Sequence, residues 1–419
     1  MLPPPPRITW LDDAGQPQPV DWRSLAGHAP PARLVLADEG LAADAAFRLI
    51  DQGSGLLWRG SYPGARLLLQ ALGRRLDKRQ QRPARPGRAA AAGLGVAAAP
   101  ASPTSPPSRT SPPSPTSPTS PPLPNHLWAE TFLAQRRQQA ERALLLGRLL
   151  LPFDADHGLP LHRAPDVRAA GLQAHGPVAS HYLASLRELL GVVGAYEWRR
   201  QGVPVAALGA RIHPHHGVFS PVRGEYVDLV AAAPLPAAAL AQGAFDIGTG
   251  TGVLAAVLAR RGLAVVATDL APAALACAAD NLQRLGLAHR VSVLPADLFP
   301  PGRAGLIVCN PPWVPAPLHA GLDAAVYDPD SRMLRGWLAG LAAHLVPGGE
   351  GWLVLSDLAE HLGLRQRAQL LGWIEGSGLR VLGRQDTRPV HRRALDAADP
   401  LHAARSAEVT SLWRLAVAP

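Results

Sequence analysis

Three short apolar stretches in the second half of the chain end in residues that could do chemistry. They end in Asp246-Ile247-Gly248-Thr249-Gly250-Thr251-Gly252, in Asp269, and in Asn310-Pro311-Pro312-Trp313. An apolar run that ends in a polar or glycine-rich turn is typical of a strand in an open parallel sheet, which presents a ligand crevice at the carboxyl ends of its strands. The sequence therefore predicts a ligand site where these turns meet.

The glycine-rich turn has the composition of a cofactor site. Gly248, Gly250 and Gly252 lie between a predicted strand and a predicted helix. Glycine lets the backbone turn sharply and approach a ligand closely, and the following helix presents free N–H groups. Asp269 lies 21 residues after Gly248, the spacing of an acid that binds a ribose hydroxyl. This spacing fits several ribose-bearing cofactors, and Asp269 could also be a structural residue at a strand end.

The motif from Asn310 to Trp313 suits a planar nitrogen as the reacting group. The lone pair of an amide or aromatic amine is delocalised, so such a nitrogen must be held in line with its electrophile. The Asn310 side-chain oxygen and the Pro311 carbonyl can accept its two N–H groups and stabilise developing positive charge. Two prolines fix the carbonyl direction, and Trp313 offers a flat face for stacking. A chance turn is the alternative, since the chain has 44 prolines.

With these motifs in place, the stretch resembles the core of class I S-adenosylmethionine (SAM) methyltransferases. Asn-Pro-Pro-Trp resembles the signature of members that methylate a planar amide or amine nitrogen. The likeness is strongest to the release factor glutamine methyltransferases and covers roughly residues 217 to 360. It implies a Rossmann-like seven-stranded sheet with one antiparallel strand, SAM as cofactor, and a protein glutamine of the translation machinery as macromolecular acceptor.

The resemblance also assigns roles to individual residues. It implies that Asp297 accepts from the adenine amino group and that Leu298 packs on the ring, although a capping or turn aspartate is the alternative. The segment from Val218 to Val230 would lead into the first core helix and line the SAM pocket. The predicted catalytic residues are Asn310, Pro311, Pro312 and Trp313. The predicted cofactor-binding residues are Asp246, Gly248, Thr249, Gly250, Thr251, Gly252, Asp269, Leu270, Asp297, Leu298 and Asn310.

Alternatives to glutamine methylation stay open. The glutamine methyltransferases usually carry Tyr where this chain has Trp313, and Trp also occurs among nucleic-acid amino methyltransferases. An N6-adenine-type methyltransferase acting on RNA or DNA is therefore the first alternative. A SAM-binding interaction module without turnover is an alternative of another class. A dehydrogenase would leave the Asn-Pro-Pro-Trp motif unexplained.

The regular elements predict an α/β fold with an α-rich accessory domain before the catalytic domain. Alternating strands and helices in the second half indicate a mostly parallel sheet. The expected strands are 244–248, 264–268, 291–294, 305–309, 351–356, 379–384 and 410–417, and the expected helices are 253–261, 272–285 and 331–345. In the first half we expect a strand at 32–37 and helices at 41–50, 64–76, 125–151 and within 178–201.

Composition divides the chain further. Residues 83–124 are rich in Pro, Ser and Thr, which predicts a disordered insertion. The resulting units are 1–82 and 125–207 for the accessory domain and 208–419 for the methyltransferase domain. We expect a cytoplasmic protein because the N-terminus lacks a signal-peptide pattern and no apolar run is long enough to cross a membrane. The only cysteines, Cys277 and Cys309, lie in apolar patterns and are expected to be buried free thiols.

The net charge of +9 raises the question of a nucleic-acid partner. One basic block contains Arg66, Arg74, Arg75, Lys78, Arg79, Arg82, Arg85 and Arg88. We interpret it as a solvated face or linker, with nucleic-acid contact as the alternative. An arginine-rich loop follows at 388–393. His213, His215 and His216 lack further ligands at metal-binding spacing, so no metal site is expected. Residues 327–330 could line the substrate cleft or cap the helix that follows.

Overall fold

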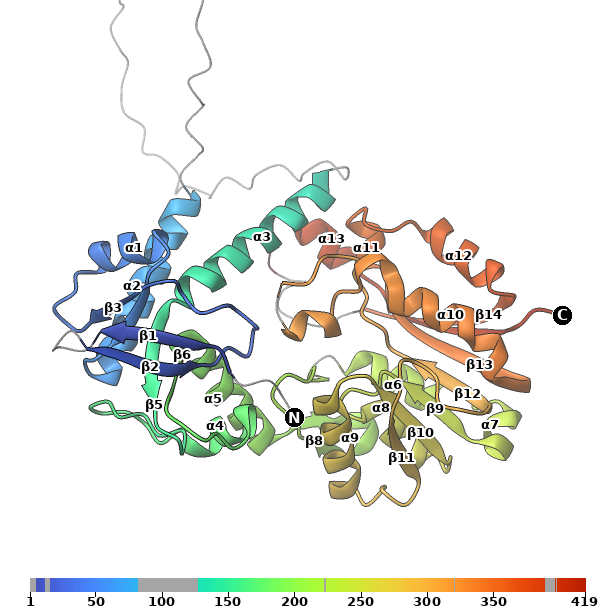
Figure 1. Ribbon diagram of the computed structural model, residues 1–419. Coiled ribbons are helices and arrows are strands. Elements are labelled where there is room, and N and C mark those ends of the chain that lie inside the picture. The colour runs from blue at the N-terminus through green and yellow to red at the C-terminus, as the bar shows by residue number, and fades with distance from the viewer. Residues whose placement is uncertain are drawn as a thin grey trace, which may run out of the picture.

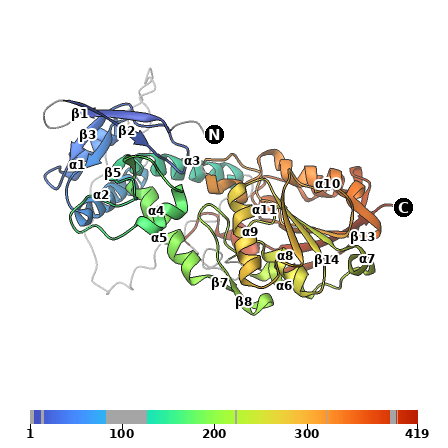
Figure 2. The same cartoon turned by 60° about the horizontal axis from the view of Figure 1, so that its bottom comes forward.

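The computed structural model describes residues 5–11, 16–81, 127–221, 224–319, 321–388, 396 and 398–419. These residues form two domains, each built around its own β-sheet. Helix α3 (Trp128–Leu146) extends from the first domain toward the second in both Figure 1 and Figure 2. The predicted insertion at 83–124 lies outside the described residues.

The second domain contains a seven-stranded sheet in the order β11-β10-β9-β12-β13-β15-β14. Six strands run parallel, and β15 pairs antiparallel with both of its neighbours. The strands are β9 (Ala244–Ile247), β10 (Val265–Asp269), β11 (Val291–Pro295), β12 (Ala304–Cys309), β13 (Leu345–Ser356), β14 (Leu379–Thr387) and β15 (Thr410–Val417). The predicted seven strands and single antiparallel strand are confirmed, although β13 begins earlier than expected.

Helices cover both faces of this sheet. They are α8 (Val253–Arg260), α9 (Pro272–Arg284), α10 (Arg332–His344), α11 (Leu358–His361), α12 (Arg367–Gly376) and α13 (His402–Ala407). Successive residues of β12 face opposite sides: Val308 packs in the cluster that contains α8, whereas Ile307 and Cys309 pack in the cluster that contains α10. Strands buried on both faces read as continuous apolar runs. Both Cys277 and Cys309 are buried free thiols, as predicted.

The first domain is an α/β domain, so the prediction of an α-rich unit with one strand is wrong in part. Its six-stranded sheet has the order β1-β2-β6-β5-β4-β3. The strands are β1 (Arg7–Leu11), β2 (Pro17–Trp22), β3 (Leu34–Ala37), β4 (Gly55–Trp58), β5 (Leu149–Phe153) and β6 (Tyr182–Ser185). The helices are α1 (Ala43–Asp51), α2 (Tyr62–Gln81), α3, α4 (Arg168–His175) and α5 (Leu186–Gln201).

Two segments predicted as single helices each contain a strand as well as a helix. The helix expected at 125–151 ends at Leu146, and three fully buried leucines that follow Gly147 belong to β5. A fully buried strand has no polar face, so its short apolar run cannot be distinguished by periodicity from the end of a helix. The helix expected within 178–201 begins only at Leu186, where the Ser185 hydroxyl accepts hydrogen bonds from two backbone N–H groups of α5.

The connection between the domains contains a small two-stranded sheet and two helices. These elements are β7 (Val203–Val205), the short 3₁₀ helix η2 (Ala206–Leu208), β8 (Ala210–Ile212), α6 (Glu225–Ala232) and α7 (Ala237–Gln242). Helix α7 packs closely on β12, because an added Cβ on Gly305 would lie 2.1 Å from the backbone carbonyl carbon of Ala238. Only glycine fits at this crossing.

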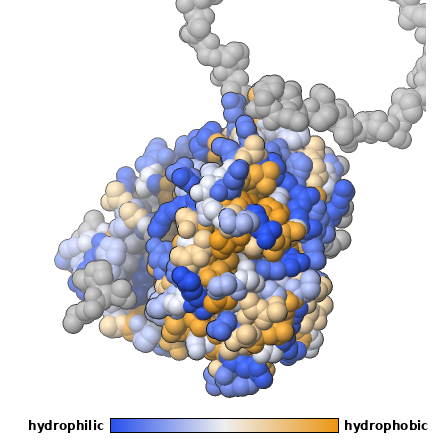
Figure 3. Space-filling view, turned by 90° about the vertical axis from the view of Figure 1, so that its right-hand side faces the viewer, coloured by the Kyte–Doolittle hydropathy of each residue, from blue (hydrophilic) through white to orange (hydrophobic). Residues whose placement is uncertain are grey.

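The face that carries α12 and the edge strand β14 exposes apolar side chains (Figure 3). Among them are Leu371, Val381, Leu382 and Val417. In Figure 1 this face lies at the end of the second domain that is remote from the first domain. Among the described residues, every helix is too short or too polar to span a membrane.

Replacing Gly305 by Ala should destabilise the second domain by roughly 1–3 kcal/mol, because the new methyl group overlaps the backbone of α7. Thermal unfolding followed by circular dichroism measures the effect. Gly372→Ala is the matched control, because an added Cβ there meets nothing within 4 Å and alanine favours the helix. Equal melting temperatures for the two variants would contradict the prediction.

Candidate functional site

The strand register brings the predicted turns together. Ile247 at the end of β9 lies opposite Cys309 at the end of β12, so Gly248 and Asn310 follow side by side. Asp269, the last residue of β10, borders the same turn from the other side. Chain connections leave the sheet in opposite directions at this point, where open α/β sheets bind their ligands.

The glycine turn has the backbone that a cofactor cradle requires. Gly248, Gly250 and Gly252 have φ angles of 71°, 54° and 79°, a region that other residues adopt at a cost. An added Cβ on Gly250 would meet nothing within 4 Å, so open space lies beside the turn. The turn leads directly into α8, whose first N–H groups have no partner within the helix. These residues therefore fit an anionic or hydroxyl-bearing cofactor.

Asp246 stabilises the glycine turn through buried hydrogen bonds. Its side chain is 1% exposed, and one carboxylate oxygen accepts hydrogen bonds from the Thr249 hydroxyl at 2.6 Å and the Ala255 N–H at 3.0 Å. Burial raises the pKa of Asp246 to about 6, although these two hydrogen bonds oppose the shift. These two hydrogen bonds connect β9 to the glycine turn and to α8. The direct contact of Asp246 with the cofactor stays a prediction.

One oxygen of Asp269 faces the glycine turn, and the other faces the chain that follows β10. Its carboxylate accepts from the Gly250 N–H at 3.0 Å and from the Ala271 N–H at 2.9 Å. Each oxygen has a second lone pair, so Asp269 can still accept ribose hydroxyls. Leu270 beside it is 67% exposed, which leaves an apolar surface next to the carboxylate.

The predicted adenine-binding residues follow β11. Asp297 is mostly exposed and lies 3.3 Å from an Arg332 nitrogen. Leu298 has a φ of 75°, and its carbonyl accepts from the Thr268 hydroxyl at 2.6 Å. That hydrogen bond fixes the turn that follows β11 against β10. The assignment of both residues to adenine stays a prediction.

The Asn310 turn is held by its own tryptophan. The Trp313 indole N–H donates to the Asn310 side-chain oxygen at 2.8 Å. An indole is only a donor, so it selects the oxygen end of the amide, and that oxygen keeps a second lone pair for a ligand. The Trp313 ring meets the Tyr226 ring edge-on at a centroid distance of 6.5 Å. The predicted stacking of Trp313 on a substrate stays a prediction.

Arg365, which the sequence does not mark, and Asp328 support this turn from neighbouring segments. Buried Arg365 directs its two terminal nitrogens toward the carbonyls of Trp313 and Ser356, at 3.5 and 3.4 Å. Burial lowers the pKa of Arg365. Asp328 accepts from the N–H groups of Met333 and Leu334, so it caps α10. The N-cap residue of α10 is Ser331, whose own side chain makes no capping hydrogen bond, so Asp328 supplies the acceptors in its place.

The loop between Trp313 and Asp328 is held by the first domain. It contains the 3₁₀ helix η3 (Gly321–Ala325), and a second 3₁₀ helix, η4 (Pro329–Ser331), follows it. Arg136 of α3 is 7% exposed and donates from one nitrogen to the Asp323 carboxylate at 2.8 Å and to the Pro317 carbonyl at 2.9 Å. Its guanidinium lies 3.4 Å from the centre of the Tyr327 ring. No local signal links residue 136 to residue 323, because the two are 187 positions apart.

The predicted basic block is partly neutralised. Arg75 pairs with Asp44 at 2.6 Å and Arg79 with Asp51 at 2.5 Å. Arg82, Arg85 and Arg88, and most of the 388–393 loop, lie outside the described residues. The block on α2 therefore offers fewer free cations to a phosphate backbone than the sequence suggests.

Two of the three histidines, His213 and His215, have protein partners in α5 and α9. His213 Nδ1 lies 2.7 Å from the Arg199 carbonyl oxygen, and His215 Nε2 lies 3.0 Å from an Asp280 oxygen. The described residues contain no cluster of three or more potential metal ligands.

Comparison with known proteins agrees with this geometry. Residues 209–370 match the family described as the Methyltransferase small domain. The strand order, the glycine turn and this match are those of a class I SAM-dependent methyltransferase domain, and they support SAM as the cofactor. Among known proteins, this domain is close to the release factor glutamine methyltransferases.

Three matches illustrate the range. The release factor glutamine methyltransferase of Cereibacter sphaeroides is 37% identical over 149 residues, which are 32% of this chain and 51% of that protein. The ribosomal RNA small subunit methyltransferase C of Alcanivorax borkumensis is 33% identical over 114 residues, 26% of this chain and 30% of that protein. A SAM-dependent methyltransferase structure from Thiobacillus denitrificans aligns with a TM-score of 0.33 and 16% identity, over 48% of this chain and 94% of that one.

The family match covers the second part of the chain. The chain spans about half the length of the first curated relative it matches and 41% of the second. The family match begins at residue 209 and therefore excludes the six-stranded sheet of the first domain.

Replacing Asp246 by Asn should change how stability depends on pH. The carboxyl group has a folded-state pKa near 6 against an ordinary value of 3.8, so wild-type protein loses stability as pH rises from about 4 through 6. The loss should reach roughly 3 kcal/mol, and Asn should remove it. Urea unfolding at pH 4 to 7 without SAM measures the difference, with exposed Asp297→Asn as control. Parallel pH profiles for wild type and Asp246→Asn would contradict this assignment.

Replacing Arg136 by Met should loosen the loop that α3 holds. Methionine keeps the apolar volume but removes both hydrogen bonds, at a cost of about 2 kcal/mol. Hydrogen exchange should become faster in residues 314–328 and stay unchanged in the glycine turn. Arg137→Met is the matched control, because Arg137 is the exposed neighbour on the same helix. Unchanged exchange in Arg136→Met would show that the loop does not depend on α3.

Proposed function

We propose that this protein transfers the methyl group of SAM to a planar amide nitrogen, the side chain of a glutamine in a protein of the translation machinery. The observation that carries the proposal is the position of Asn310 next to Gly248 on neighbouring strands. An acceptor nitrogen bound by Asn310 would lie beside the cofactor turn. The release factor glutamine methyltransferases among the relatives support the choice of glutamine.

The proposed chemistry depends mainly on positioning. The amide nitrogen gains the methyl group and then loses one of its two protons to solvent, so no base has to act before the transfer. When bound, SAM supplies an already activated methyl group. The Asn310 oxygen and the Pro311 carbonyl accept the two N–H groups of the amide, which turns its lone pair toward the methyl donor. The same oxygens stabilise positive charge that develops on the nitrogen. The Trp313 indole keeps the Asn310 amide oriented for this task.

A nucleic-acid amine is the second candidate acceptor. Ribosomal RNA small subunit methyltransferase C among the relatives favours it. The ion pairs of Arg75 and Arg79 count against it, because binding a nucleic acid depends on free cations that displace counterions. We propose a protein acceptor in the cytoplasm as the better supported reading.

Asn310→Ala should lower methyl transfer by at least about 100-fold and leave SAM affinity within a factor of two. Alanine removes the side-chain acceptor but not the glycine turn. Label transfer from SAM to a purified peptide chain release factor measures activity, and calorimetry measures SAM binding. Gln283→Ala, on the exposed side of α9, is the control. Full activity of the Asn310→Ala variant would contradict the proposed mechanism.

The acceptor class can be tested separately in a lysate from cells that lack the protein. Wild-type protein and labelled SAM are added, and the product is divided between protease and nuclease. Loss of label with protease supports a protein acceptor, whereas loss with nuclease moves the proposal to RNA or DNA. No label in any fraction would leave the domain as a SAM-binding module.

A further inference from the structure

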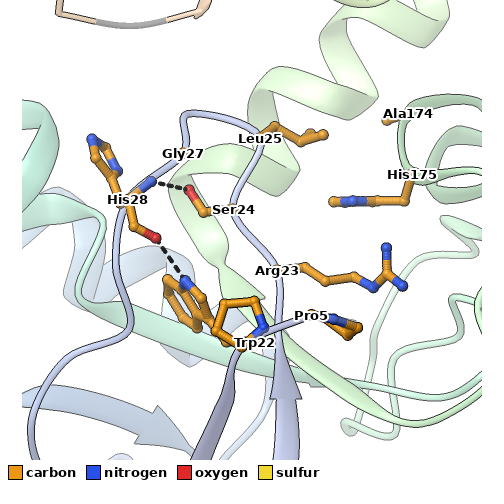
Figure 4. Close-up of a pocket in the computed structure, with 10 residues that line it drawn as sticks. Pro5, Trp22, Arg23, Ser24, Leu25, Gly27, His28, Ala174 and His175 are labelled. Carbon is orange, nitrogen blue, oxygen red and sulfur yellow. Dashed lines mark hydrogen bonds between the residues drawn. The ribbon is translucent and has the colours of Figure 1, made fainter. Parts of the chain in front are cut away.

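The first domain carries a hollow of about 380 Å³ at the end of β2 (Figure 4). Its lining includes Pro5, Pro6, Trp22, Arg23, Leu25 and His175. In Figure 1 this end of β2 points toward the methyltransferase domain. Nothing in the methyl-transfer proposal uses these residues, and the hollow lies outside the stretch that matches the methyltransferase family.

Arg23 is the charged group of the hollow without a protein partner. Within the described chain, its side chain makes no hydrogen bond or ion pair, and its Nε atom is buried. The guanidinium lies 5.6 Å from the centre of the Tyr182 ring. This contact can hold one face of the guanidinium and leaves its N–H edge available. A buried donor without an acceptor is costly. The described part of the chain leaves the guanidinium of Arg23 unsatisfied, and an anion in the hollow could accept from its terminal N–H groups (Figure 4).

The loop around Arg23 is preorganised. The Trp22 indole N–H donates to the His28 carbonyl at 2.8 Å. Glu188 of α5 accepts from the Ser24 hydroxyl at 2.7 Å and from the Leu25 N–H at 3.0 Å. These bonds close the loop before any ligand arrives, so little conformational entropy would be lost on binding.

The charge balance inside the hollow favours an anion. Both oxygens of Glu188 are already engaged by Ser24 and Leu25. Burial and the nearby Arg23 lower the pKa of His175 to about 4, so His175 is neutral near pH 7. Glu188 itself does not line the hollow, so Arg23 is the one permanently charged residue among the described residues of the lining.

We propose that this hollow is a carboxylate-binding site in which Arg23 binds an aspartate or glutamate side chain of the protein acceptor. The inference rests on the proposed function, because it concerns the acceptor of the same reaction. An arginine edge matches a carboxylate with two parallel hydrogen bonds. Prolines, Trp22 and Leu25 offer an apolar surface for the neighbouring peptide. A nucleic-acid strand would need several cations along its path, and the lining contains one permanently charged cation.

The test measures binding of two fluorescent peptides, tetraglutamate and tetraglutamine, to the full-length protein at low salt. Wild type should prefer tetraglutamate, and Arg23→Gln should weaken that binding at least about tenfold. Arg66→Gln is the matched control, because Arg66 is an exposed arginine of the same domain outside the hollow. Arg23→Lys, which keeps the charge but loses the two-pronged geometry, should fall between wild type and Arg23→Gln.

Several results would overturn the proposal. Equal binding of tetraglutamate by wild type and Arg23→Gln would do so, and so would a wild type with no preference for the acidic peptide. A uridine tetranucleotide could also bind more tightly than tetraglutamate and lose that affinity in Arg23→Gln. This result would show that the site binds a phosphate and not a carboxylate. Unchanged melting temperature and SAM affinity of Arg23→Gln establish that the variant is folded.

Methyl transfer to the release factor is assayed separately with the same variants. If the carboxylate site is real and the release factor is the acceptor, Arg23→Gln should raise KM at least about tenfold and leave kcat within a factor of two. Peptide binding through Arg23 without any methyl transfer would reject the proposed function and keep the site. Methyl transfer that is insensitive to Arg23 would reject the site and keep the function.

Discussion

The parallel pairing of β9 with both β10 and β12 is the constraint on which the site depends. This pairing places the glycine turn, Asp269 and Asn310 at one edge of the sheet, although they span more than sixty positions of the chain. A slip of one residue between β9 and β12 would turn the alternate side chains of β12 to the wrong face. Two buried clusters, one on each face, therefore fix the register and with it the site.

Asp246 shows how the fold stabilises a turn that would otherwise be costly. The turn contains three residues with positive φ, and the helix after it begins with N–H groups that have no partner within the helix. A single buried carboxylate oxygen accepts from Thr249 and from the third residue of α8. The raised pKa records the desolvation that this arrangement costs. The hydrogen bonds recover part of that free energy, so the cradle is formed before a cofactor binds.

The second domain could be predicted well because its signals are local. Apolar runs, the spacing of Asp269 and the Asn310 turn follow from residues close in sequence, and all seven strands are found. The first domain could not be predicted equally well. Its strands β4, β5 and β6 are buried on both faces, so they lack the alternation that separates a strand from a helix. The structural roles of Arg136 and Arg365 could not be predicted, because their hydrogen-bond partners are carbonyls and a carboxylate far along the chain.

Two arginines of the first domain, Arg136 and Arg23, differ in whether their charge is paired within the described chain. Arg136 is enclosed and reaches an acidic partner in the methyltransferase domain, so its charge is satisfied within the protein. Arg23 lies in an open hollow and reaches no carboxylate of the described chain. A buried charge is tolerated when it is paired. The contrast supports the proposal that Arg23 binds a carboxylate of the acceptor, whereas Arg136 holds a loop of the methyltransferase domain.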